Sequence, residues 1–274
     1  MRKVLIEILM LMTIFIWGNQ FAGVNLQPEL YGIVVGGTMV LFIELVDYLI
    51  REWAFLKLYW DCWKPWTEKE IRLTIAYLYR IEVNGKYLLV KSNRIANTYQ
   101  PVGGVYKYYN PEAKQELDSM GAITDNKIDN DDVSECDLRL NLLNRKKIGS
   151  FLKWFFKGEK RECDPWREFY EELVASGILP AKEFGYIHYE LVGQQFEPIH
   201  RDSFFNVDTF KYADIFIPKF VTNKQKEEIK KLQTINSTEY IWVTQQEIKQ
   251  GKSNGNHLIA EHSKKIFHNK ILHQ

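Results

Sequence analysis

The sequence predicts an α+β protein in which an N-terminal transmembrane helical hairpin is followed by an α-β-α sandwich domain. Two long apolar runs within the first fifty residues indicate the hairpin. From residue 71 onwards, alternating apolar and polar residues indicate strands, and apolar residues three and four positions apart indicate helices. A largely hairpin-built sheet mixed with helices is typical of an α+β domain.

The two apolar runs are residues 4–17, VLIEILMLMTIFIW, and residues 30–50, LYGIVVGGTMVLFIELVDYLI. A helix needs about 20 apolar residues to cross the hydrocarbon core of a bilayer. We therefore predict a transmembrane hairpin over residues 1–50. Lys and Arg flank both outer ends but are absent between Lys3 and Arg51, so the positive-inside rule places both termini in the cytoplasm. A cleaved signal peptide is the alternative, but no small-x-small cleavage site follows the first run.

The second apolar run also predicts association between copies. Gly32 and Gly36 form a small-xxx-small pair, which lets helix backbones approach closely. Glu44 lies about two turns further on, near the same face, and a carboxyl within a span usually faces a bundle interior or water. We predict that these three residues take part in membrane assembly. The alternative is that Glu44 only extends towards the headgroups.

Residues 51–70, REWAFLKLYWDCWKPWTEKE, combine basic residues with four tryptophans. Tryptophan is enriched at membrane–water interfaces. We interpret this segment as an interfacial linker, with a helix packed on the following domain as the alternative.

The composition excludes several classes of protein. The 274 residues carry 36 Lys and Arg against 35 Asp and Glu, so no global charge indicates binding of long nucleic acid. Cys62, Cys136 and Cys163 are odd in number and widely spaced. They suit neither a disulfide framework nor a zinc site, and they indicate a reducing compartment.

The domain over residues 71–274 begins with a predicted β-hairpin, LTIAYLYRIEV and KYLLVKSNR around Asn84-Gly85, the strongest short hairpin signal. Residues 110–137 are polar and acidic, which predicts a surface excursion that is partly disordered. Residues 145–161 predict a basic amphipathic helix, either a packing helix or a contact for anionic lipid or phosphate. Further strands are predicted in FGYIHYELVG, FKYADIFIP and TEYIWV, with a terminal helix over roughly residues 257–270.

The segment DPWREFYEELVASGIL, residues 164–179, predicts a helix with Asp164 as N-cap and Pro165 in the first turn. Glu168, Glu171 and Glu172 share one face because they stand at i, i+3 and i+4. Three neighbouring carboxylates suit a hard divalent ion such as Mg²⁺ or Mn²⁺. A solvated helix face tolerates the same pattern, so both interpretations stay open.

REFYEEL followed by Gly177-Ile178 resembles the core of the Nudix box, G-x5-E-x7-R-E-U-x-E-E-x-G-U, where U is aliphatic or aromatic. Gly103-Gly104 in PVGGV resembles the glycines that open the box, and EYIWVTQQEI resembles the closing strand and helix of that fold. The resemblance covers roughly residues 71–270 and implies a Nudix-like α-β-α sandwich. It implies that Arg167 orients a carboxylate, and that three glutamates and the Gly104 carbonyl hold any metal: Glu168, Glu171 and Glu172.

The chain departs from the Nudix pattern in three places. Arg167 lies 63 positions after Gly104 instead of 14, which implies that residues 110–163 form an insertion within the box. The first glutamate has no clear counterpart, and the closing glycine, Gly177, comes late. These departures favour binding over hydrolysis.

A membrane hairpin joined to an interrupted box resembles the two-transmembrane NUDIX effectors of bacterial cyclic-oligonucleotide antiphage signalling (CBASS), which carry the SMODS-associated NUDIX domain. The resemblance implies an inner-membrane receptor that binds a cyclic di- or oligonucleotide, forms a ligand-driven homo-oligomer and disrupts the bilayer without a cofactor. The alternative is a membrane-anchored, Mg²⁺-dependent hydrolase of a nucleoside diphosphate derivative. Candidate nucleotide-binding residues, with Tyr99 as a stacking platform, are Arg94, Tyr99, Gly103, Gly104 and Arg167.

Overall fold

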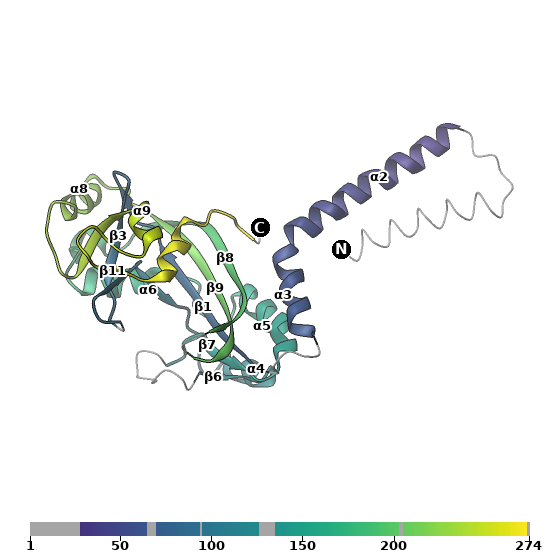
Figure 1. Cartoon of the computed structure of the whole chain (residues 1–274), viewed down its shortest axis with the longest axis horizontal. Helices are drawn as coiled ribbons and strands as arrows, with labels where there is room; N and C mark the ends of the chain where they lie inside the picture. Colours follow the sequence, from purple (N-terminus) through teal and green to yellow (C-terminus); the bar gives the residue numbers. More distant parts are fainter. Residues whose placement is uncertain (1–27, 65–69, 94, 126–134, 203–204, 273–274) are drawn as a thin grey trace. The chain divides into compact units, whose positions relative to one another are not determined.

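The computed structural model describes residues 28–64, 70–93, 95–125, 135–202 and 205–272 (Figure 1). The chain divides into two compact units, one that ends at Trp60 and one that runs from Asp61 to Gln274. Within the first unit, the described residues form α2 (Pro28–Arg51) and most of α3 (Trp53–Trp63).

The prediction of an N-terminal transmembrane hairpin is wrong. Across the described ranges, no helix combines the length and the apolar character that crossing a membrane requires. In α2, the uninterrupted apolar part lies between Glu29 and Glu44 and covers residues 30–43. At 1.5 Å per residue it spans about 21 Å, which is shorter than the hydrocarbon core of about 30 Å. The first predicted run, residues 4–17, lies outside the described residues.

Gly32, Gly36 and Glu44 all lie on α2, and the Glu44 side chain is exposed. Among the described residues, nothing beyond the neighbouring residues and the backbone of α2 itself lies within 4 Å of the position that a Cβ at Gly36 would take. Their predicted role in membrane assembly depended on a membrane span, which α2 is too short in its apolar part to provide.

The described residues of the second unit form two sheets. The larger is six-stranded, in the order β6-β7-β1-β9-β8, with β5 paired to β1. Its central strand β1 runs parallel to β9, and Figure 1 shows β8 and β9 as the long hairpin beside β1. The strands are β1 (Ile71–Tyr79), β5 (Gly103–Val105), β6 (Ala122–Thr124), β7 (Arg139–Leu142), β8 (His188–Asp202) and β9 (Val207–Lys219).

The polar segment 110–137 is not only a surface excursion. It contains α4 (Lys114–Ser119) and β6, and β6 and β7 together extend the large sheet beyond β1. Leu117 and Ala122 are buried, so part of this acidic segment packs into the domain.

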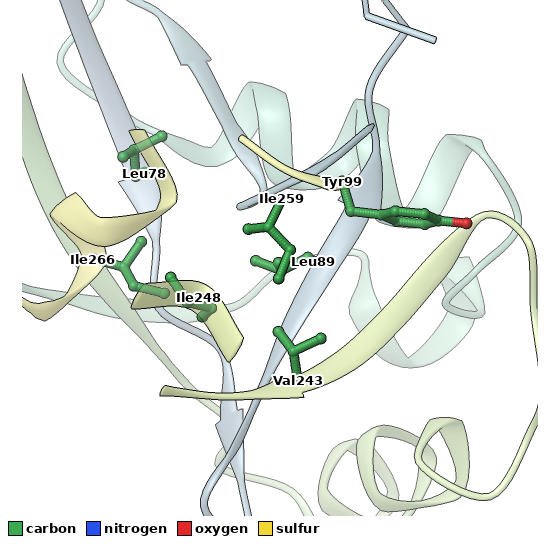
Figure 2. Close-up of a cluster of buried hydrophobic side chains, with 7 residues drawn as sticks. All are labelled: Leu78, Leu89, Tyr99, Val243, Ile248, Ile259 and Ile266. Atoms are coloured by element: carbon green, nitrogen blue, oxygen red, sulfur yellow. The ribbon is translucent and has the colours of Figure 1, made fainter. Parts of the chain in front are cut away.

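The smaller sheet has five strands in the order β10-β3-β4-β11, with β2 paired to β3. Its turn at Asn84-Gly85 is the predicted one, with both residues at positive φ, as a type I′ turn requires. The predicted first strand is divided, however: only β2 pairs with β3, and β1 belongs to the larger sheet. The strands are β2 (Glu82–Val83), β3 (Lys86–Lys91), β4 (Thr98–Gln100), β10 (Tyr240–Thr244) and β11 (Leu258–Ile259). Figure 2 shows the apolar core on this sheet, formed by Leu78, Leu89, Tyr99, Val243, Ile248, Ile259 and Ile266.

The helices follow the predicted apolar patterns with two differences. The basic helix is η1 (Arg145–Lys147) followed by α5 (Ile148–Lys157), and its apolar side is fully buried, so it is a packing helix. The terminal helix predicted over roughly residues 257–270 is instead β11 followed by a 3₁₀ helix, η3 (Glu261–Phe267). The remaining helices are α6 (Trp166–Phe169), η2 (Tyr170–Ala175), α7 (Ala181–Phe184), α8 (Asn223–Leu232) and α9 (Gln245–Gln250).

Candidate functional site

The site begins where β5 meets the helix that carries Glu168, Glu171 and Glu172. Gly103 pairs with Leu78 and Gly104 with Tyr77 on β1. Gly103 has φ +148°, and a Cβ there would lie 2.3 Å from the Tyr77 carbonyl oxygen. A Cβ on Gly104 would lie 2.0 Å from Oε1 of Glu168. Gly103 therefore requires glycine for its backbone, whereas at Gly104 the Glu168 side chain occupies the place that a Cβ would take.

The helix begins one residue later than predicted, with Pro165 instead of Asp164 at the N-cap position. The Asp164 carboxylate still accepts the N–H of Trp166 at 2.8 Å. The helix starts as the α-helical turn α6 and continues as the π-helical turn η2. Phe169 and Leu173 are fully buried and fix the helix on the sheet. Glu168 lies on the α-helical turn, whereas Glu171 and Glu172 lie on the π turn, a feature often found at functional sites.

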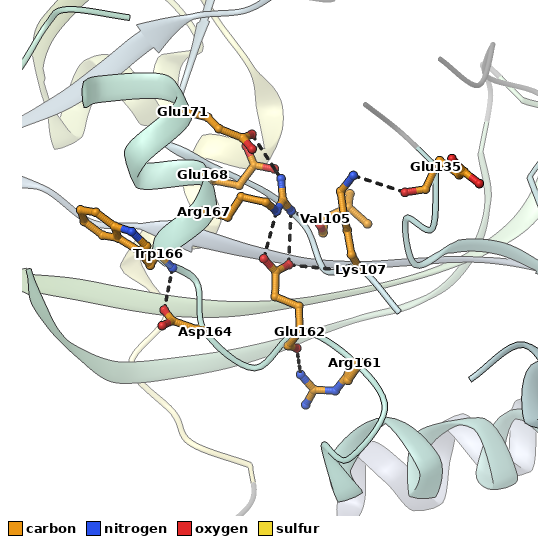
Figure 3. A network of polar contacts seen from close by, with 10 residues as sticks. All are labelled: Val105, Lys107, Glu135, Arg161, Glu162, Asp164, Trp166, Arg167, Glu168 and Glu171. Atoms are coloured by element: carbon orange, nitrogen blue, oxygen red, sulfur yellow. Dashed lines mark hydrogen bonds and ion pairs between the residues drawn. The ribbon is translucent and has the colours of Figure 1, made fainter. Parts of the chain in front are cut away.

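Arg167 lies at the centre of the carboxylates (Figure 3). Its Nε donates to Glu162 Oε1 at 3.0 Å, and its Nη2 donates to Glu162 Oε2 at 3.2 Å and to the Val105 carbonyl at 3.0 Å. Its Nη1 donates to Glu168 at 2.6 Å and to Glu171 at 3.3 Å. A guanidinium has five N–H donors. All five are therefore engaged by oxygens of the protein itself.

Glu172 reaches back to the glycines. Its Oε2 accepts the N–H of Gly103 at 2.9 Å. Burial raises the pKa of Glu172 to about 8, although the bond from Gly103 opposes the shift. Burial also raises the pKa of Glu168, against the attraction of Arg167. At neutral pH, Glu172 is therefore mainly protonated, while Arg167 neutralises part of the remaining negative charge.

These contacts do not fit a bound Mg²⁺. Within the part of the chain that the structure describes, no group of three or more His, Cys, Asp or Glu side chains is placed to hold a metal ion. A hard cation needs ionised oxygen ligands that converge on one point. Here Glu168 is directed to Arg167 at 2.6 Å, and Glu172 is directed to the Gly103 N–H. A metal would have to replace both contacts.

The predicted nucleotide-binding residues separate into three groups. Gly103, Gly104 and Arg167 come together at this site. Tyr99 does not join them: its ring is 5 % exposed in the core of Figure 2, and its hydroxyl donates to the Thr238 carbonyl at 2.7 Å. The ring therefore has no free face on which a base could stack. Arg94 lies outside the described residues.

Glu162 is the residue that the sequence pattern missed. It binds Arg167 through both carboxylate oxygens. In the sequence it stands between the two glycines and the arginine. The Nudix pattern places its first glutamate eight positions before the arginine, whereas Glu162 stands five before Arg167. A search for any carboxylate in the turn before Asp164 would have found it.

The comparison with protein families agrees with this geometry. The model of the SMODS-associated NUDIX domain matches residues 70–267, which include both sheets and the whole carboxylate site. No curated protein and no solved structure matches the chain.

Proposed function

Because the chain belongs to the SMODS-associated NUDIX domain family, we propose that residues 70–267 are a receptor for a nucleotide second messenger, a cyclic di- or oligonucleotide. SMODS-associated NUDIX domains are associated with effectors of the CBASS type. The proposed role is therefore that of a sensor in antiphage defence. Disruption of a bilayer by a membrane hairpin is not part of the proposal.

The engagement of Arg167 and its glutamates supports binding over hydrolysis. A metal-dependent hydrolase needs ionised carboxylates around an open coordination position for water. In this site Arg167 bonds to Glu162, Glu168 and Glu171. Glu172 is mainly protonated at neutral pH and accepts the Gly103 N–H. The carboxylates thus form an internal framework that holds the helix against β5.

Calorimetry on the full chain with a panel of cyclic di- and trinucleotides tests this proposal. We expect one member of the panel to bind, with and without Mg²⁺, and chromatography to recover that nucleotide intact after prolonged incubation. Glu183→Gln serves as a control, because Glu183 lies on α7 and makes none of the contacts of this site. Absence of binding across the panel would contradict the receptor function.

A Mg²⁺-dependent hydrolase of a nucleoside diphosphate derivative is the second candidate. The observation in its favour is that four glutamates surround Arg167 and the two glycines: Glu162, Glu168, Glu171 and Glu172. Glu171 is the most exposed of these, and among the described residues it is held through one bond of 3.3 Å, so it is the easiest to recruit. Rapid Mg²⁺-dependent turnover that Glu171→Gln abolishes, with folding unchanged, would favour the hydrolase over the receptor.

A further inference from the structure

The helix that carries the glutamates also presents aromatic rings to solvent. Figure 3 shows the Trp166 ring directed away from Arg167 and its glutamates. The ring centroids of Tyr170 and Tyr186 lie 5.8 and 6.4 Å from that of Trp166, and His188 adds a fourth ring, 5.2 Å from Tyr186. Tyr170 is 42 % exposed and Tyr186 is 61 % exposed. Single exposed aromatic residues are common, whereas contiguous ones mark binding sites. These four residues are hereafter called the aromatic platform.

The ring of Tyr186 is open to solvent, but its backbone is held in place. Its interplanar angles with Trp166 and His188 are 44° and 84°, so neither ring lies parallel over it. The Gln225 side-chain amide donates to the Tyr186 carbonyl at 3.2 Å, and the next residue, Ile187, is buried. A rigid aromatic side chain on a fixed backbone binds another flat ring at a low cost in conformational entropy.

Positive charge lies beside the aromatic platform. Gln225 stands between Lys224 and Lys226 at the start of α8, and both lysines are exposed. Among the described residues, neither lysine forms an ion pair. Later in the same helix, Glu228 is already paired with Lys231 at 3.6 Å. The turn of α8 that bonds to the Tyr186 carbonyl therefore carries two positive charges that an anionic ligand can use.

We propose that the aromatic platform binds a base of a nucleotide and that Lys224 and Lys226 attract its phosphate. The inference rests on the proposed receptor function, and it places the nucleotide away from the carboxylates around Arg167, which are engaged with one another. Every base has a π face and stacks on aromatic side chains. A phosphate is stabilised by ammonium donors, and these two lysines need not break an ion pair to reach it. An apolar peptide would use the rings but gain nothing from the lysines.

An NMR titration of the full chain with adenosine 5′-monophosphate, observed by saturation transfer, tests the aromatic platform. We expect saturation to reach the base protons, and Tyr186→Ala to weaken binding about 5- to 150-fold, as the loss of a stacked base does. Tyr186→Phe keeps the ring and should bind like wild type. The matched control is Tyr109→Ala, which removes a tyrosine that is 50 % exposed and lies between β5 and α4. Absence of transfer to the base in wild type overturns the proposal, as do equal affinities of Tyr186→Ala and Tyr109→Ala.

A comparison of adenosine 5′-monophosphate with adenosine tests the lysines. The double variant of Lys224→Gln and Lys226→Gln should weaken binding of the monophosphate and leave that of adenosine unchanged. Lys230→Gln, further along α8, serves as the control. Equal effects of the double variant on the two compounds overturn the assignment of the phosphate.

The panel of cyclic di- and trinucleotides separates this inference from the receptor function. A cyclic nucleotide that binds wild type and Tyr186→Ala equally well overturns the role of the aromatic platform and leaves the receptor function standing. Absence of binding across the panel, together with binding of adenosine 5′-monophosphate that depends on Tyr186, contradicts the receptor function and supports the aromatic platform.

Discussion

Glu162 and Arg167 are joined by two N–H···O bonds, of 3.0 and 3.2 Å, and no other glutamate contacts Arg167 through both carboxylate oxygens. This comparison covers the glutamates within the described residues. A bidentate pair of this kind combines charge with a fixed geometry. It connects the turn before Asp164 to the helix, and through the Val105 carbonyl to β5.

Arg167→Met should destabilise the domain more than Glu162→Gln. Removal of the arginine leaves Glu162, Glu168 and Glu171 close together without their shared counter-charge, whereas removal of one glutamate leaves two partners for Arg167. We expect a loss of about 2–4 kcal/mol for the arginine variant and about half of that for the glutamate variant. Chemical denaturation measures both, with Lys182→Met as the exposed control. A larger cost for Glu162→Gln would contradict this assignment of roles.

Gly104→Ala should displace the Glu168 side chain rather than unfold the protein. The added Cβ meets Oε1 and Cδ of Glu168, which are the mobile end of a side chain, at 2.0 and 2.2 Å. The same change at Gly103 meets the Tyr77 backbone and should be far more damaging. We expect Gly104→Ala to cost about 1–2 kcal/mol, most of it from the lost bond between Glu168 and Arg167.

A double-mutant cycle with Glu168→Ala tests the mechanism of that loss. Once the glutamate side chain is absent, Gly104→Ala should have little further effect, because nothing remains for the new methyl group to displace. Strictly additive costs would show that the alanine acts on the backbone instead. Ligand binding by each variant, measured in parallel, separates stability from recognition.

The sequence predicted elements whose determinants are local. The Asn84-Gly85 turn and the bond from the Trp166 N–H to Asp164 depend on neighbouring residues, and the buried side of α5 follows from a 3.6-residue period. The prediction of a transmembrane hairpin was wrong because it relied on apolar composition. Glu44 interrupts the apolar part of α2 before it is long enough to span a bilayer. The number of residues between charged side chains, and not the mean apolar content, decides whether a helix can cross a bilayer.

The site could be predicted only in part because its contacts join residues that are distant in the sequence. Gly103 and Glu172 are 69 positions apart, and β6 and β7 lie in the insertion between them. The π turn of the helix has no recognisable sequence period. The prediction that Tyr99 stacks on a nucleotide base was wrong for a different reason. An aromatic residue beside a glycine motif is more often part of the core, and Tyr99 is buried.

Glu172 should make the domain less stable as the pH rises. Burial raises its pKa to about 8 in the folded protein, from an ordinary value near 4.5. Between these two values the folded state holds a proton that the unfolded state releases, so stability is highest below about pH 4.5 and falls up to about pH 8. Because the carboxyl keeps some contact with solvent, we expect a fall of about 2–3 kcal/mol. Glu172→Gln should remove this part of the pH dependence, and an unchanged profile would contradict the prediction.

His262 should act in the opposite direction at lower pH. Burial, together with the positive charge of Lys265, lowers its pKa to about 4, whereas Glu197 favours the charged form and Lys211 opposes it. Between pH 6.5 and about 4 the unfolded chain binds a proton that folded His262 does not, so stability falls as the pH falls through this window. We expect a contribution of about 2–3 kcal/mol. Denaturation of wild type and His262→Gln at pH 7 and pH 4.5 isolates it, because the titration of other groups is common to both proteins. Relative to wild type, the variant should be more stable at pH 4.5 than at pH 7. A stability difference that does not change with pH would show that His262 is not held neutral in the folded state.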